Sequence, residues 1–222
     1  MLFSLLQSSE VTVTDIIYSL FASLIIVFVC IPFSDFAQAW LAVKLGDNTP
    51  QYNGRLTINP FAHIDPIGAI MMVLFGFGFS KGMPFNPYNF KKPRQGVLYI
   101  SIIGPLSLLV FGFFFFVLCE ILGATFLAVQ SNFVSFLVEA LYLIAYLNVG
   151  LAVFYLIPIP PLDGGNILWH FLPDRIVEKL RPYERYFPFV LMLLIFSGAL
   201  DVPLMYARMF FLNLFDLITF WM

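Results

Sequence analysis

Long apolar blocks run through this chain, separated by prolines, glycines and charged residues. A helix needs about 20 apolar residues to cross the hydrocarbon of a bilayer. The blocks cover residues 14–45, 97–122, 134–157, 187–200 and 203–220. With 61% hydrophobic and 11% charged residues, the chain has too few polar groups to cover a water-soluble fold. The sequence therefore predicts an all-α integral membrane protein with about five transmembrane helices.

Three further segments complete the predicted organisation. The apolar run at 67–79 is rich in glycine and too short to span, so we interpret it as a re-entrant hairpin. The opening residues are too short an apolar stretch for a secretory signal peptide, and we expect 1–13 to be an interfacial lead-in. Residues 14–175 are then the membrane core, and 176–222 form C-terminal helices.

Basic residues predict the orientation in the membrane. Of the 11 Lys and Arg, all but Arg208 fall in the loops 43–96 and 159–186. The positive-inside rule places both loops on the cytoplasmic side of a multi-pass protein of the cell membrane and leaves Arg208 on the far side. A net charge of -2 excludes a nucleic-acid partner, whereas membrane lipid is an expected one.

Ionisable residues at membrane depth are costly and usually mark a functional cavity. Asp35 lies inside the first apolar block, and Asp163 follows a segment that contains three prolines. Those prolines remove backbone donors and must interrupt the helix, which is tolerated in a membrane only inside protein or beside water. The sequence predicts a polar pocket near Asp163.

Four segments resemble the site-2 protease family of intramembrane zinc metalloproteases, over about residues 25–173. They are Leu45-Gly46-Asp47, the run GRLTINPFAHIDPIG at 54–68, the Gly104-Pro105 pair and the run LIPIPPLDGG at 156–165. The resemblance implies a site-2 protease-like core. It also implies that Asp163 stands where the family has its zinc-binding aspartate.

The resemblance fails at the centre of the active site. The family has His-Glu-x-x-His on the first core helix, whereas this chain reads Ser34-Asp35-Phe36-Ala37-Gln38. Neither a hydroxyl nor an amide is an ordinary zinc ligand, so Asp163 is the only surviving family ligand. We therefore expect no catalytic residues, no metal and no cofactor, although active relatives would hold zinc.

The surrounding pocket also departs from the family. Leu108 and Tyr155 occupy positions where the family usually has asparagine. We expect the pocket to be lined by His63, Asn59, Tyr155, Asn148 and Pro160. The pattern indicates a pseudoprotease that binds a transmembrane helix of a client or partner protein without cleaving it.

Two catalytic alternatives remain open. Asp35, His63 and Asp163 could hold a metal if the loop carrying His63 folded into the pocket. Asp35 and Asp163 could alternatively share a proton as an aspartyl dyad. The favoured interpretation is that His63 binds backbone in the turn at 59–65 and that Asp35 binds neighbouring polar groups or water. A transporter has less support, because the spans show no paired inverted halves.

Overall fold

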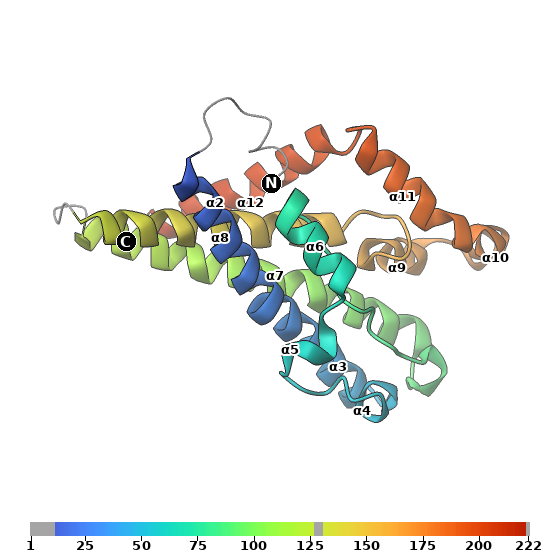
Figure 1. Ribbon diagram of the computed structural model, residues 1–222. Helices are drawn as coiled ribbons and strands as arrows, with labels where there is room; N and C mark the ends of the chain where they lie inside the picture. The colour runs from blue at the N-terminus through green and yellow to red at the C-terminus, as the bar shows by residue number, and fades with distance from the viewer. Residues whose placement is uncertain (1–11, 127–130, 221–222) are drawn as a thin grey trace.

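The computed structural model describes residues 12–126 and 131–220. Within these ranges, four helical stretches are long and apolar enough to cross a membrane. They are Val13–Lys44, Pro93–Thr125, Asn132–Tyr155 and Asp201–Thr219. The predicted all-α membrane fold is confirmed, and the first stretch crosses the next two diagonally (Figure 1).

The first stretch consists of α2 (Val13–Ile25), the π-helical turn η1 (Ile26–Cys30) and α3 (Ile31–Lys44). Its N-terminus is a capping box in which Thr12 and Asp15 satisfy each other's backbone N–H groups. α2 packs mainly on α8, whereas α3 packs on α7. The predicted lead-in at 1–13 lies almost wholly outside the described residues.

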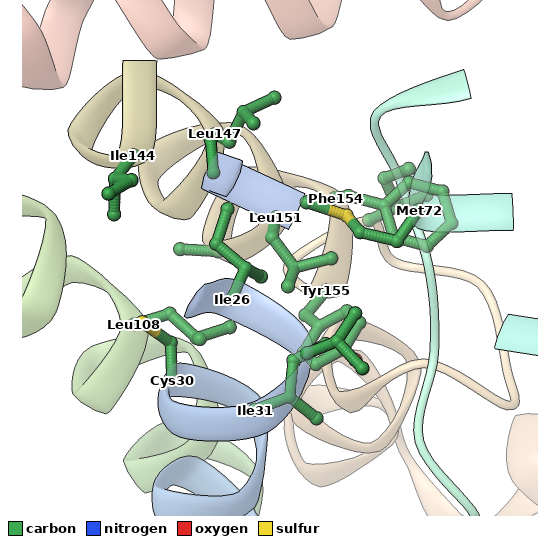
Figure 2. Packing of buried hydrophobic residues seen from close by; sticks show 14 of the residues in the cluster. Ile26, Cys30, Ile31, Met72, Leu108, Ile144, Leu147, Leu151, Phe154 and Tyr155 are labelled. Carbon is green, nitrogen blue, oxygen red and sulfur yellow. The ribbon is translucent and has the colours of Figure 1, made fainter. Parts of the chain in front are cut away.

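The core lies where the first stretch meets α7 (Pro93–Phe126) and α8 (Asn132–Tyr155). Figure 2 shows the centre of this cluster, with side chains from η1, α3, α6, α7 and α8 in contact. The labelled residues are Ile26, Cys30, Ile31, Met72, Leu108, Ile144, Leu147, Leu151, Phe154 and Tyr155. Because the contacts are apolar and interlocking, they fix the positions of the polar groups one turn further along α3.

The glycine-rich run folds back on itself. Helix α6 (Pro66–Phe75) begins at Asp65, whose carboxylate accepts hydrogen bonds from two backbone amides. It ends at Gly76, which has a φ of 79°. The returning chain packs so closely on α6 that a Cβ on Gly68 would lie 1.9 Å from the Phe79 carbonyl oxygen. A bridge between Ile64 and Ser80 closes the hairpin.

The loop between the first two spans is organised around a buried carboxylate. It contains α4 (Thr49–Tyr52), α5 (Pro60–His63) and the 3-10 turn η2 (Pro87–Asn89). Asp47 is fully buried and accepts hydrogen bonds from Thr49, from the Asn86 backbone and from the Asn89 side chain. This carboxylate joins the two ends of the loop.

After α8 the chain forms short helices before its last span. The short helices are α9 (Asp163–Phe171), α10 (Asp174–Leu180), η3 (Arg181–Tyr186) and α11 (Phe187–Phe196). The last span is α12 (Asp201–Thr219). The 10 residues of α11 rise only about 15 Å, half the hydrocarbon thickness. It ends before Gly198, which has a φ of 71°. The described spans therefore number four rather than about five, because the block at 187–200 breaks.

We predict that the Asp47→Asn variant is less stable by about 1–3 kcal/mol, because an amide cannot accept all of these hydrogen bonds. Burial raises the pKa of Asp47, but the hydrogen bonds from Thr49, Asn89 and Asn86 outweigh it, and the pKa lies below the ordinary 3.8. The carboxylate therefore stabilises the fold above pH 3.8, and this contribution disappears as pH falls through the lowered pKa.

Thermal unfolding in detergent, measured from neutral pH to pH 3, tests this expectation. The difference between wild type and Asp47→Asn should shrink at the acid end. A difference that stays constant or grows on acidification would contradict it.

Candidate functional site

A polar cluster lies on α3, at the positions that the family motif would occupy. Ser34, Asp35 and Gln38 are all buried, with at most 8% of each residue exposed. Their spacing places Ser34 and Gln38 one helical turn apart on the same face. The Ser34 hydroxyl donates a hydrogen bond of 2.9 Å to the carbonyl oxygen of Gly104 on α7.

Gln38 joins α3 to the start of α9. Its Nε2 donates a hydrogen bond of 3.0 Å to Oδ2 of Asp163. Gly104 leaves the space for this contact, because a Cβ there would lie 2.0 Å from the Gln38 Nε2 and 2.9 Å from the Asp163 Oδ2. A hydrogen bond therefore joins the side chains at two positions where the resemblance places zinc ligands.

Asp35 faces His63 from the loop. The His63 Nδ1 lies 3.4 Å from the Asp35 Oδ2, and the imidazole is 1% exposed. The His63 Nε2 lies 2.8 Å from the Thr57 carbonyl oxygen, which can only accept, so Nε2 must carry a proton. The distance between the His63 Nδ1 and the Asp35 Oδ2 is longer than that of a good hydrogen bond, and the Asp35 Oδ2 has no hydrogen-bond partner in the described structure.

Tyr155, the last residue of α8, completes the cluster. It is buried and lies within electrostatic range of Asp35 and Asp163. Its side chain also contacts the backbone of Ser80 on the returning segment of the hairpin. Tyr155 therefore links the re-entrant segment to both carboxylates.

The other residues expected at the pocket occupy different places. Asn148 is buried on α8, level with Cys30 of η1. Its Nδ2 donates to the Ile144 carbonyl and lies 3.5 Å from the Cys30 Sγ. Asn59 is exposed and caps α5 by accepting a hydrogen bond from Phe61. Pro160 is buried in the loop against Gly165. Ser34, Asp35, Gln38, His63, Tyr155 and Asp163 therefore form the site.

The side chains present do not fit a zinc ion. A catalytic zinc site uses three protein ligands from histidine, cysteine and carboxylate. Within the described ranges, no group of three or more such residues is placed to hold a metal. The Ser34 hydroxyl is directed to a carbonyl oxygen, and the Gln38 amide N–H is directed to the one carboxylate that the family would use.

Two elements of the site were not anticipated from the sequence. The Gly104 carbonyl serves as the acceptor for Ser34, and the Thr57 carbonyl orients His63. A glycine inside an apolar span, level with polar residues of another span, is the signal that could have indicated the first contact. For His63 a backbone contact was expected in the turn at 59–65, and the structure places the acceptor at Thr57, two residues before that turn.

The fold and the arrangement of the site define the core of an intramembrane metalloprotease-like protein. The family model for peptidase family M50 matches residues 67–196. The chain belongs to this family, which is the site-2 protease family. The matched range contains Asp163 but not the segment 34–38.

Two curated proteins are similar to the chain. "Putative zinc metalloprotease YwhC" of Bacillus subtilis (strain 168) is 36% identical over 166 residues, which are 75% of this chain and 75% of that protein. "Putative zinc metalloprotease Rip2" of Mycolicibacterium smegmatis (strain ATCC 700084 / mc(2)155) is 26% identical over 172 residues, 75% of this chain and 63% of that protein. No solved structure matches the chain.

We predict that the Gln38→Leu variant loses about 1–3 kcal/mol of stability, because Asp163 is left buried without its amide donor. The double variant Gln38→Leu/Asp163→Leu should cost less than the sum of the two single changes, by about 1 kcal/mol. Unfolding in detergent measures all three. Gln95→Leu, at an exposed position, is the matched control and should stay within about 0.5 kcal/mol of wild type. Strict additivity would mean that the Gln38–Asp163 contact contributes nothing.

Proposed function

We propose that this chain is a non-catalytic member of the site-2 protease family that binds a transmembrane helix of a client or partner protein. The observation that carries the proposal is the hydrogen bond between Gln38 and Asp163. It joins two of the positions at which the resemblance places zinc ligands. An amide N–H on the carboxylate replaces the metal that would otherwise connect the same two elements.

The relatives support the proposal by contrast. Both are named as zinc metalloproteases, and that activity requires ligands that Ser34 and Gln38 do not supply. The scaffold around these positions is nevertheless complete, with the re-entrant hairpin, the proline-rich loop and the packed α7–α8 pair all present. A retained scaffold without the catalytic ligands favours binding over hydrolysis.

An apolar groove beside the site supports helix binding. It has a volume of about 490 Å³ and lies between α3 and α7, next to the contact of Ser34 with Gly104. Its lining consists of Phe33, Ile103, Leu106, Ser107, Val110, Phe111 and Phe114. The one hydroxyl in it, that of Ser107, is already bonded to the Ile103 carbonyl. Such a lining suits the aliphatic and aromatic side chains of a helix in the membrane.

One observation favours a second function, an active intramembrane protease with an altered centre. Asp35 and His63 face each other in a buried site, with the His63 Nδ1 3.4 Å from the Asp35 Oδ2, and Asp163 lies within electrostatic range of Asp35. A carboxylate paired with an imidazole is a common source of general-base chemistry. In this alternative Asp35 and His63 would activate water for cleavage of a transmembrane substrate, with or without a bound metal.

We predict that the purified natural chain, prepared without chelators, carries no stoichiometric metal by elemental mass spectrometry. The variant Ser34→His/Asp35→Glu/Gln38→His should carry about one zinc per chain, because it restores three family ligands with Asp163. Near-stoichiometric metal in the natural chain would overturn the proposed loss of the metal site.

A second prediction tests binding and cleavage together. A labelled transmembrane peptide in vesicles should associate with the wild-type chain, measured by energy transfer, and remain intact. Val110→Trp should fill the groove and weaken association about tenfold, the effect of losing one close helix contact. Val190→Trp, an equal change at an exposed position of α11, should not. Cleavage that disappears in Asp35→Ala and Asp163→Ala would instead establish the protease.

A further inference from the structure

A single arginine lies deep inside the last span. Arg208 is seven residues after Asp201, the first residue of α12, and eleven before Thr219, the last. At the rise of an α-helix these separations are about 10 Å and 16 Å. The apolar block expected at 203–220 contains Arg208, and the structure places this residue near the middle of α12.

The guanidinium occupies the contact between α12 and α8. It lies over the ring of Tyr146, 4.2 Å from its centroid. Gly150, one turn further along α8, provides the space, because a Cβ there would lie 2.4 Å from the Arg208 Nη2. The Arg208 Nε is buried and has no hydrogen-bond partner among the residues that the structure describes. An aromatic face attracts the cation, but it accepts none of the directed N–H bonds of the guanidinium.

No carboxylate in the described part of the chain pairs with Arg208. The ion pairs found there join His63 to Asp35 and Arg94 to Asp174. Asp216 lies about two turns further along α12, near Tyr142, and Asp201 lies about two turns back. An arginine without an anion at this depth is costly, and such residues usually have a partner.

The surroundings of Arg208 form an open surface, which we call the α8–α12 seam. It consists of Tyr142, Tyr146, Gly150, Met205, Arg208 and Met209. Tyr142, Met205 and Met209 are 46%, 43% and 50% exposed. Only 11% of the apolar stretch of α12 is buried inside the protein, so most of the surface of this helix is open to a further helix.

We infer that the α8–α12 seam binds a transmembrane helix of a different membrane protein that carries an aspartate or glutamate level with Arg208. The inference rests on the proposed helix-binding function and adds a surface separate from the groove between α3 and α7. A carboxylate would accept two parallel N–H bonds from the guanidinium and neutralise its charge.

A second copy of this chain does not supply the partner. In a symmetric pair with the axis along the membrane normal, equivalent residues lie at equal depth, so Arg208 would meet the other arginine. Asp201 and Asp216 of the copy would lie about two turns from that level. Asp35 is buried against His63 and is not presented to a neighbour. Glu139 lies seven residues before Tyr146 on α8, and Glu120 adjoins Cys119, which contacts the Val138 carbonyl, so these carboxylates of the copy also lie away from the level of Arg208. A helix of another protein is therefore the occupant that the inference names.

The test uses three synthetic transmembrane peptides in phosphatidylcholine vesicles with the purified full chain. All are leucine-rich with lysine at both ends, and they differ only in one residue, glutamate, glutamine or leucine, placed seven residues from the end level with Asp201. Energy transfer measures their association. The glutamate peptide should bind the wild-type chain about tenfold more tightly than the leucine peptide.

Variants assign the effect to Arg208. Arg208→Leu should remove the preference for glutamate, Arg208→Lys should keep part of it because the charge remains, and Met209→Leu should leave it unchanged. Thermal unfolding of each variant shows that it is folded.

The outcomes distinguish this inference from the proposed function. Equal binding of all three peptides would overturn the acidic partner while leaving helix binding in place. A preference for glutamate that survives in Arg208→Leu would also overturn it. If wild type, but not Arg208→Leu, retains phosphatidylglycerol after purification and shows no peptide preference, the anion is a lipid phosphate and the inference fails.

Discussion

A polar group buried inside a membrane protein must find its partner within the protein, and this constraint governs the site described above. Gln38 and Asp163 belong to elements far apart in the sequence, and each satisfies the other through one hydrogen bond. The bond is possible because Gly104 has no side chain. It fixes the start of α9, which in turn fixes the proline-rich loop before it. The order of the site follows from satisfying two polar groups in an apolar surrounding.

Two buried ionisable groups meet the same constraint in different ways. Asp35 lies against an imidazole whose other nitrogen is held by a backbone carbonyl, so a polar ring of the same chain faces the carboxylate. Arg208 cannot lose its proton, and within the described residues it contacts an aromatic ring and no carboxylate. Both groups of the first arrangement belong to the described chain. The second is electrostatically incomplete, which is why the two residues lead to different functional conclusions.

Much of this architecture could be predicted from the sequence, because its signals are local. Apolar runs of sufficient length located the spans, and the order of the family segments located Asp163 and the positions of Ser34 and Gln38. The placement of His63 beside Asp35 could not be read in this way, since it depends on how α5 packs on the first span. The five apolar blocks and the four described candidate spans differ at 187–200, where α11 has 10 residues and is too short to span by itself.

The π-helical turn η1 has a consequence for the whole polar cluster. A π turn holds one more residue than an α turn, so it rotates every later residue by about 100° relative to a continuous α-helix. The first span changes its phase at this turn: α2 presents its buried face to α8, and α3 presents its own to α7. Shortening η1 by one residue would swing Ser34 and Gln38 away from Gly104 and Asp163. The alignment of the polar groups on α3 is therefore set by the length of the apolar segment that precedes them.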